Sequence, residues 1–301
     1  MYKYADRRRN RSGYRRLVQE GEATSMRKVS LALFFLLVLA VYSVEKELPV
    51  IESAKKLAET KARKVVWQKD GSIMVQIPGV LEVIPSKVVP AIYNELGDVV
   101  QAETVIHEKK IQISNKFFMD ACEVTVGQFR TFLKSSGYKP DTDIDWSEVR
   151  KYAPSNRHPM IYVTWHDAAA YAEWAGKRLP YEHEWEFAAR GGLTNKKYPW
   201  GNDDSVARDH ANHEYIGGKD KWDTQTAPVG SFLPNKYNLH DMVGNVYEWC
   251  QDWYSNEQKY RVLRGGSWNL STLFLHVTSR INYVPSFRHS YLGFRCVLES
   301  P

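Results

Sequence analysis

The amino-acid sequence predicts an α+β fold with a few helices, small sheets and long irregular connections. Three segments with helical patterns end at glycine residues, within 125–137, 164–176 and 182–192. A strand-like run, FFMDACEV, precedes them at 117–124. After Gly192 the chain is rich in Asn, Asp, Gly and aromatic residues and has little helical periodicity, which predicts loops and short strands.

The composition of the 301-residue chain is that of a folded protein, with 43% hydrophobic and 25% charged residues. It excludes a disordered or collagen-like chain and allows one large domain or two ordinary ones. The net charge of +6 lies in residues 1–28, a basic arm that holds nine basic and three acidic residues. The remainder is neutral overall. We therefore expect no nucleic-acid partner for the folded part, although the arm could attract RNA or DNA.

Residues 29–44, VSLALFFLLVLAVYSV, are uncharged and largely apolar. This run is short for a spanning helix, which needs about 20 residues. It suits the apolar region of a signal peptide preceded by Arg27 and Lys28. Met26 is an alternative start, in which case the residues before it are not translated. If the chain begins at Met1, the run is a signal anchor that keeps the basic arm in the cytoplasm.

Both alternatives predict an exported protein, which is either periplasmic or anchored in the inner membrane facing outward. A buried core strand or helix is the less favoured interpretation of the apolar run. Apolar residues then recur at helical spacing over 50–66, so residues 45–70 are predicted to form a charged helical linker. Residues 71–301 form the predicted domain, in which 72–118 contains strands with irregular joins.

The predicted helices have recognisable ends. Thr125 and Gln128 have the spacing of a capping box, and Gly137 stops the helix that they begin. Thr164 caps the second helix, and acidic residues occupy the first turn of the third, over 182–189. The chain has three cysteines and no CxxC pair, so at least one thiol is unpaired within the chain and a structural zinc site is not expected.

Six linked segments follow one another in a characteristic order: FFMDACEVTVGQF (117–129), HPMIYVTWHDAAAYAEWAGKRLPYEHEWEFAARGG (158–192), YPWGN (198–202), TAPVGSFLPNKYNLHDMVGNVYEWCQDWY (226–254), RVLRGGSW (261–268) and LGFRC (292–296). In order and spacing they resemble the formylglycine-generating-enzyme (sulfatase-modifying factor) domain family, over about residues 110–298. The resemblance implies a C-type-lectin-like fold: a single loop-rich α+β domain with small antiparallel sheets. In that fold the first strand pairs with the last.

This pairing would bring FFMDACEV beside LGFRCVLE and Cys122 near Cys296, so the resemblance implies a disulfide between these two residues. Two buried thiols that merely pack are the alternative. In the family's enzymes the Cys of GFRC pairs with a Cys just before the RGG turn. Ala189 stands at that position here, so the family's own disulfide is absent.

In catalytic members of the family, two cysteines that follow the GGS motif hold copper. The corresponding positions here fall on Leu270 and Leu275, and this loop contains no other Cys. Because Cu(I) requires soft ligands such as thiolates, we expect no bound copper and no formylglycine generation by that mechanism. The sequence therefore assigns no catalytic residue.

The resemblance also implies structural calcium, which takes oxygen ligands from irregular loops. One expected ligand set is Asp241, Gly244, Val246 and Glu248, with main-chain oxygens from the middle two. The other expected set comprises Asn212, His213, Asp220 and Trp222, where Asp223 competes with Asp220 because the loop length differs. Ordinary loop acids and turn formers are the alternative interpretation of both sets.

Two functions remain open from the sequence. The first is an exported, non-catalytic binding or assembly module for a peptide, protein or glycan, attached to the membrane through residues 29–44 if they are not cleaved. The second is an oxidoreductase that uses a different metal site in the oxidative maturation of a secreted metabolite or protein.

Overall fold

The computed structural model describes a folded domain within the unit Pro49–Pro301, and Met1–Leu48 form a separate unit. The described residues are 47–84, 87–89, 92–93, 99–101, 104–106, 109–113, 116–214, 221–222 and 224–299. The basic arm, the apolar run 29–44 and the expected ligand Asp220 lie outside them, as does Asp223. Within the described ranges, no helix has both the length and the apolar character needed to cross a membrane.

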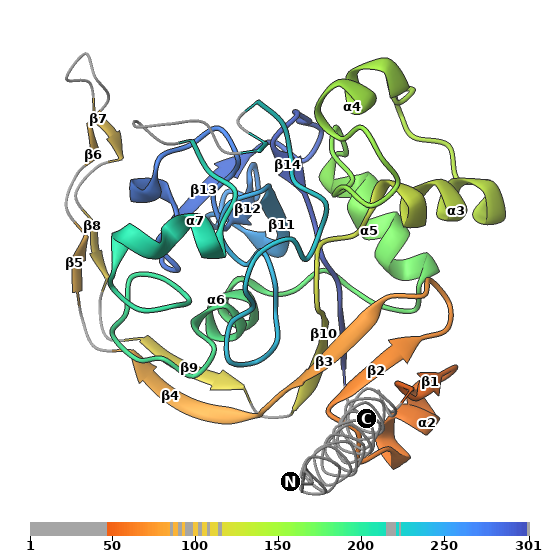
Figure 1. The fold of residues 1–301 in the computed structure, drawn as a ribbon, viewed down its shortest axis with the longest axis horizontal. Helices are drawn as coiled ribbons and strands as arrows, with labels where there is room; N and C mark the ends of the chain where they lie inside the picture. Colours follow the sequence, from red (N-terminus) through yellow and green to blue (C-terminus); the bar gives the residue numbers. More distant parts are fainter. Residues whose placement is uncertain are drawn as a thin grey trace, which may run out of the picture. The chain divides into compact units, whose positions relative to one another are not determined.

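The first sheet joins the beginning and the end of the domain (Figure 1). Its strands lie in the order β1 (Val50–Ile51), β2 (Lys64–Trp67), β3 (Ile73–Ile77), β10 (Phe117–Asp120) and β15 (Val297–Glu299). Strand β10 is antiparallel to both of its neighbours, and Met119 pairs with Val297. The predicted pairing of the FFMDACEV segment with the C-terminal strand is therefore confirmed.

The second sheet is built from strands of the C-terminal half of the chain. Its strands lie in the order β13 (Arg280–Tyr283), β12 (Arg261–Arg264), β11 (Tyr247–Trp253) and β14 (Leu292–Gly293). Strand β14 is parallel to β11, and the Tyr247 N–H donates to the Tyr291 carbonyl at 2.8 Å. This contact holds the end of the 284–291 segment against the beginning of β11.

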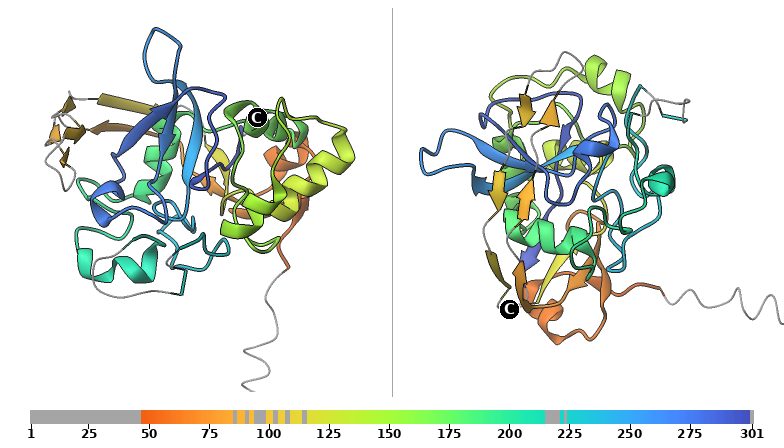
Figure 2. Two further views of the ribbon diagram at one scale, coloured as in Figure 1. Left: turned by 90° about the horizontal axis from the view of Figure 1, so that it is seen from above. Right: turned by 90° about the vertical axis from the view of Figure 1, so that its left-hand side faces the viewer.

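Three two-stranded ribbons follow β3, where the sequence predicts strands with irregular joins. They pair β4 (Val80–Ile84) with β9 (Lys109–Ile113), β5 (Lys87–Val89) with β8 (Thr104–Ile106), and β6 (Ile92–Tyr93) with β7 (Val99–Gln101). In two perpendicular views these ribbons lie on the opposite side of the domain from helices α3 (Val126–Ser136), α4 (Trp146–Tyr152) and α5 (Trp165–Trp174) (Figures 1 and 2).

The predicted helix ends are confirmed. The Thr125 hydroxyl accepts the Gln128 N–H at 3.2 Å, while the Gln128 side chain accepts the Thr125 N–H at 2.9 Å. Gly137 ends α3 with φ 69°, and Thr164 begins α5. The sequence predicts the third helix, α6 (Glu182–Arg190), but not α4. The short helices are η1 (Asp204–Val206), α7 (Ala207–His210) and η2 (Thr272–Phe274).

Residues 45–70 differ from the predicted helical linker. They contain β1, the six-residue helix α2 (Ala54–Glu59) and β2, and they belong to the first sheet. Leu57 and Val65 are buried, and the Trp67 indole N–H donates to the Ala175 carbonyl at 2.7 Å. Ser53 and Thr60 cap α2 after less than two turns, so the helix is shorter than the apolar spacing predicts. The later apolar residues of the same pattern belong to strand β2.

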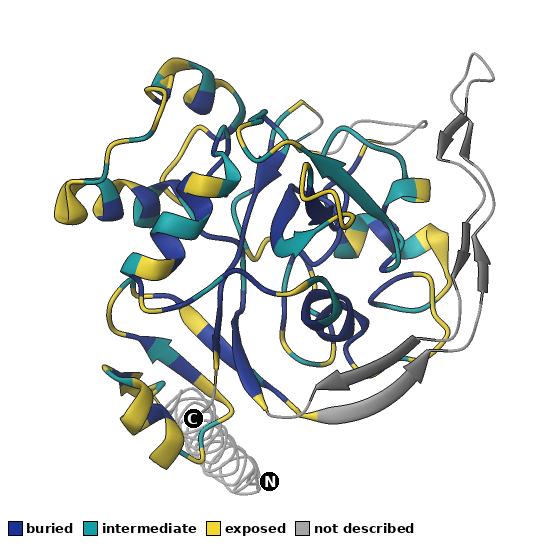
Figure 3. Cartoon of the chain, turned by 180° about the vertical axis from the view of Figure 1, so that it is seen from behind, coloured by how far each residue is buried: buried dark blue, intermediate teal, exposed yellow. Residues whose placement is uncertain are grey.

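Buried residues form two large clusters and one smaller cluster around Trp67. One large cluster lies among α3, α5 and the second sheet, and the other gathers around α6 and β10. Most of α6 is buried, as the dark-blue helix near the centre of Figure 3 shows. The domain therefore surrounds α6 with loops and strands on several sides.

The disulfide between Cys122 and Cys296 is absent from the structure, in which both are free thiols, as is Cys250. The strand register explains the difference. The Asp120 N–H bonds the Cys296 carbonyl, so Cys122 lies two residues beyond the pairing partner of Cys296. Cys296 packs in the α3–α5 cluster, whereas Cys122 packs against the α6 cluster.

Candidate functional site

The two segments expected to bind calcium meet in space. The Asn245 N–H donates to the Asn212 carbonyl at 2.8 Å, and the Asn212 side-chain amide faces Asn245 Oδ1 at 3.3 Å. Gly244 has φ 79°, and a Cβ at this position would collide with the Asn212 carbonyl oxygen. Only glycine suits this combination of backbone conformation and close approach.

Asp241 and Glu123 each have one carboxyl oxygen that accepts no hydrogen bond from an N–H or hydroxyl group of the described chain. Asp241 is buried, and its Oδ2 accepts the Gly230 N–H at 2.6 Å. Glu123 is also buried, and its Oε1 accepts from the Asn245 amide at 2.8 Å. Within the described residues, no N–H or hydroxyl donor reaches Asp241 Oδ1 or Glu123 Oε2, and the two carboxyl groups hydrogen-bond to each other. Burial raises the pKa of both carboxyl groups.

Glu248 has a different environment from the one that the resemblance implies. The Arg295 guanidinium donates to both of its oxygens at 2.8 Å, and the Trp185 indole N–H donates to Oε2 at 2.8 Å. Glu248 therefore has good donors without a metal. Glu123, Asp241 and Glu248 are thus three buried carboxyl groups near one buried guanidinium, and the hydrogen bond between Glu123 and Asp241 requires a proton on one of these two.

The second expected calcium set is only partly described, because Asp220 is not among the described residues. Asn212 donates its amide to the Gln225 carbonyl at 3.0 Å, and the Trp222 carbonyl accepts the Gln225 N–H at 2.9 Å. His213 is buried, with Nδ1 at 3.0 Å from the Glu214 carbonyl oxygen. Across the described ranges, no three His, Cys, Asp or Glu side chains gather as metal ligands.

Leu270 and Leu275 lie in different surroundings. Leu275 is fully buried in the α6 cluster, where a Cβ on Gly266 would come within 2.6 Å of its Cδ2. Leu270 is half-buried and packs against the edge of the α3–α5 cluster. All three thiols lie elsewhere, and burial raises the pKa of each, so they are protonated at neutral pH.

Half-buried aromatic rings pack against the same buried cluster as Leu270, and we call them the aromatic surface. Its members are Tyr152, Tyr162, Trp268, Tyr283, Phe287, His289 and Tyr291. The rings of Tyr152 and Trp268 stack at 5.7 Å, and those of His289 and Tyr291 lie 4.0 Å apart. The Tyr283 and Tyr291 hydroxyls are hydrogen-bonded at 3.0 Å. The sequence analysis did not single out this surface, although the aromatic content of 281–291 was a usable signal.

Tyr162 occupies a strained position within the aromatic surface. Its φ of 56° is rare for a bulky side chain. The backbone is held there because the Tyr162 N–H donates to the His289 carbonyl at 3.1 Å, while its hydroxyl donates to Glu148 at 3.2 Å. Such outliers persist only where the surroundings enforce them, and they concentrate at ligand sites.

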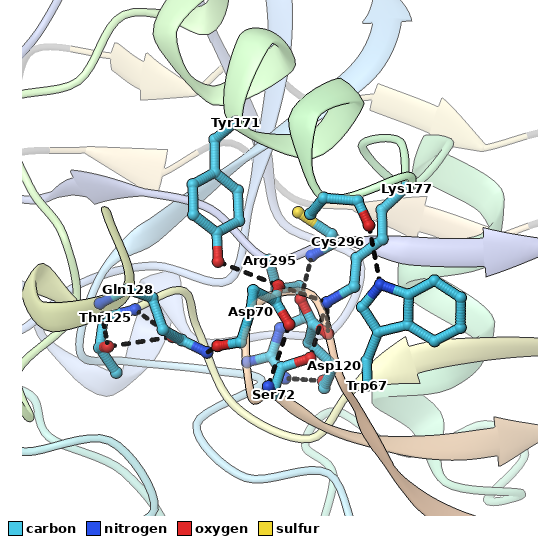
Figure 4. Close-up of polar contacts among 11 residues, drawn as sticks. Trp67, Asp70, Ser72, Asp120, Thr125, Gln128, Tyr171, Lys177, Arg295 and Cys296 are labelled. Atoms are coloured by element: carbon cyan, nitrogen blue, oxygen red, sulfur yellow. Dashed lines mark hydrogen bonds and ion pairs between the residues drawn. The ribbon is translucent and has the colours of Figure 1, made fainter. Parts of the chain in front are cut away.

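A buried ion cluster joins parts of the first sheet to the chain that follows α5 (Figure 4). The Lys177 ammonium donates to Asp70 at 2.7 Å, to Asp120 at 2.8 Å and to the Ser72 hydroxyl at 2.6 Å. Burial lowers the pKa of Lys177, but attraction to Asp120 and Asp70 outweighs burial and raises it overall. Asp120 also accepts the Cys296 N–H at 3.0 Å, which joins the cluster to the segment that carries Arg295.

The fold, the strand order and the arrangement of these motifs agree with the comparison to known families. Residues 55–300 match the sulfatase-modifying factor enzyme 1-like domain, and the chain belongs to this family. The match begins within α2, in agreement with the inclusion of α2 and β2 in the domain.

Three relatives illustrate the range of the family. The formylglycine-generating enzyme of Thermomonospora curvata is 32% identical over 249 residues, which cover 61% of this chain and 82% of the relative. The inactive C-alpha-formylglycine-generating enzyme 2 of Bos taurus is 43% identical over 148 residues, or 46% of this chain and 49% of the relative. The solved structure of PvdO from Pseudomonas aeruginosa is similar with a TM-score of 0.65 and 27% identity, covering 80% of this chain and all of that chain.

Proposed function

We propose that this chain is an exported binding or assembly module that holds a peptide or glycan segment of its partner on the aromatic surface. The observation that carries the proposal is the set of half-buried rings that contact one another, with Tyr162 held at a positive φ. Tyrosine and tryptophan side chains suit such a role, because they offer a large apolar area and a polar group at little cost in conformational entropy.

The proposal includes the loss of copper chemistry from the loop that contains Leu270 and Leu275. Aliphatic side chains there offer no metal ligand, and Leu275 occupies the core instead of a cleft. The similarity to a relative that is named inactive is consistent with a family member without oxidase activity.

We also propose that calcium stabilises the loops around Asp241. Two buried carboxyl groups lie close together, and each has an oxygen that no N–H or hydroxyl donor of the described residues reaches, which supports a divalent cation there in place of the proton that they share. Asp241 and the carbonyls of Gly244 and Val246 are the proposed ligands, with Glu123 as the second carboxylate because Arg295 already engages Glu248. A bound calcium ion would supply compensating positive charge and fix the loops.

Export is part of the same proposal and rests on the apolar run 29–44 behind a basic arm. It would place the domain in the periplasm, or hold it on the outer face of the inner membrane if the run is not cleaved. Fusion of residues 1–60 to a reporter enzyme that is active only outside the cytoplasm tests this point. An active fusion is expected, and a cytoplasmic fusion would contradict the proposal.

The second candidate is an oxidoreductase with a different metal site. Similarity to the formylglycine-generating enzyme of T. curvata is the observation that favours it. Metal content and oxygen uptake separate the two candidates. A binding module retains calcium alone and consumes no oxygen, whereas the oxidoreductase retains stoichiometric copper or iron and consumes oxygen with its substrate.

Peptide and glycan arrays test the binding proposal directly. We expect the protein to select a subset of ligands and Tyr152→Ala to lose at least tenfold in affinity for them, because Tyr152 stacks on Trp268. Tyr181→Ala is the matched control, since Tyr181 is exposed at the beginning of α6 and outside the aromatic surface. Equal affinity of Tyr152→Ala and the wild type would refute the assigned surface.

A further inference from the structure

A second surface lies between α3 and α4 and differs in chemistry from the aromatic surface. A shallow groove of about 550 Å³ is lined by Arg130, Leu133 and Lys134 of α3 and by Trp146 and Arg150 of α4. The apolar side chains Leu133 and Trp146 are half-buried, and the three cationic side chains are exposed. We call these five residues the basic groove.

The spacing of the residues explains why they share one groove. Arg130 and Lys134 are four residues apart on α3, and Trp146 and Arg150 are four residues apart on α4, so each pair occupies one helix face. The Arg130 guanidinium lies 4.6 Å from the centre of the Trp146 ring, which joins the two helices across the groove.

Within the described part of the chain, the positive charge of the basic groove is not paired in ion pairs. None of its three cations has a carboxylate at ion-pair distance there, whereas Lys177, Arg264 and Arg295 are each paired. Of the nearby acids, Asp145 caps α4 and also attracts Arg150 from beyond ion-pair distance, and Glu148 accepts the Tyr162 hydroxyl. Like charges four residues apart also disfavour α3, so folding alone does not explain their placement.

We propose that the basic groove docks an acidic peptide segment of a partner protein, with carboxylates on the cations and an apolar side chain over Leu133 and Trp146. Guanidinium groups bind carboxylates through two parallel hydrogen bonds, which suits a segment with acids on either side of an apolar residue. A lipid surface fits less well. None of the exposed large apolar residues of the described chain belongs to α3 or α4, and insertion into a bilayer requires protruding apolar groups.

Helix α4 connects this proposal to the rest of the molecule. Trp146 and Arg150 face the basic groove, whereas Glu148 and Tyr152 belong to the region of the aromatic surface. A partner can therefore contact both surfaces across one helix. The proposal for the basic groove rests on the residues that line it, however, and does not depend on ligand binding by the aromatic rings.

Fluorescence anisotropy of a labelled peptide, acetyl-EDLEDFEDE-amide, with the full chain tests the proposal. We expect binding at 50 mM NaCl that weakens at least tenfold at 250 mM NaCl, since the groove contributes three charges. A charge-reversed peptide, with Lys in place of each Asp and Glu, should not bind. The triple variant Arg130→Glu, Lys134→Glu, Arg150→Glu should lose at least tenfold in affinity, and Trp146→Ala should weaken binding with an unchanged salt dependence.

The matched control is the triple variant Lys55→Glu, Lys61→Glu, Arg63→Glu, which changes the net charge equally at exposed positions outside the groove. It should retain the wild-type affinity within twofold, and circular dichroism should show that both triple variants are folded. Equal losses in the two triple variants would overturn the proposal. So would groove-dependent binding to vesicles of 30% phosphatidylglycerol in phosphatidylcholine without binding of the peptide.

Discussion

Lys177 shows how much of this fold depends on single buried side chains. It forms ion pairs with both Asp70 and Asp120, which come from the turn between β2 and β3 and from β10, and all three groups are shielded from water. Asp120 in turn accepts the N–H of Cys296, next to Arg295. One ammonium group thus connects three distant parts of the chain.

Replacement of Lys177 by Met should therefore be costly. It leaves two buried carboxylates without their cation, and we expect a loss of about 3–5 kcal/mol in the free energy of unfolding, measured by urea titration. Lys56→Met is the control, because its ion pair with Glu52 is exposed and contributes about 0–1 kcal/mol. Similar losses in the two variants would contradict the assigned role of Lys177.

His158 provides a pH-dependent contribution to stability. It is buried beside Ser155, with Nδ1 at 2.8 Å from the hydroxyl, and burial lowers its pKa below the ordinary 6.5. The unfolded chain therefore takes up a proton at higher pH than the folded one, so stability falls as the pH drops below about 6.5. His158→Asn should flatten this dependence between pH 7.5 and 5.5 in thermal unfolding, whereas replacement of the exposed His166 by Gln should leave it unchanged.

Asp241 is the residue on which the calcium proposal depends most. At a calcium concentration about 100-fold above its Kd, the ion should stabilise the wild type by about 2.7 kcal/mol. This corresponds to a rise of about 5–10 °C in Tm for a domain of this size. Asp241→Gly, which suits the positive φ, should abolish the rise, and Asn238→Gly at a similar φ should retain it. A full calcium response in Asp241→Gly would remove Asp241 from the ligand set.

The calcium ligands expected from the sequence motifs and those proposed from the structure overlap only in part. The sequence singled out Asp241, Gly244 and Asn212, which do lie together. It missed Glu123, because a lone acid before the α3 cap carries no local signal, and its partner Asn245 is 122 positions away. It assigned Glu248 to calcium and gave no sign of the bond from Arg295, because the approach of Arg295 depends on the pairing of β11 with β14.

At the scale of elements, Gly244 determines how closely the two loop segments approach. Gly244→Ala should lose at least about 1 kcal/mol more stability than Gly137→Ala, as measured by chemical unfolding. Both glycines have a positive φ, but only the Cβ at 244 meets a backbone carbonyl, whereas the Cβ at 137 meets nothing within 4 Å. Equal losses of unfolding free energy in the two variants would show that the two loop segments can move apart without loss of stability.

Helices were more predictable than strands and loops in this chain. The caps at Thr125 and Thr164 depend on neighbouring residues alone, so the sequence located them. Helix α2 is short, and its apolar residues face a sheet whose strands come from both ends of the domain. No local pattern distinguishes that arrangement from a solvated helix. The pairing of Phe117–Asp120 with the C-terminal strand could be predicted only through the family resemblance.

At the scale of the whole molecule, the N-terminal elements belong to the folded unit. A truncated chain that starts at residue 47 should unfold with the cooperativity of the full chain. A chain that starts at residue 71 lacks β1, α2 and β2 together with Asp70 and the Trp67 contact to Ala175, so it should be insoluble or lose several kcal/mol of stability. Calorimetry of the two chains checks this, and equal stability would contradict the assignment of 49–70 to the domain.

The central claim is that a formylglycine-generating-enzyme fold serves here as a binding module without copper oxidase chemistry. Titration of the purified chain with Cu(I) in competition with a chromophoric chelator, followed by oxygen-uptake measurement with a cysteine-containing peptide, tests it most directly. We predict no equivalent of copper retained against the chelator and no oxygen uptake above the protein-free rate. One tightly held Cu(I) per chain with peptide-dependent oxygen uptake would contradict the claim.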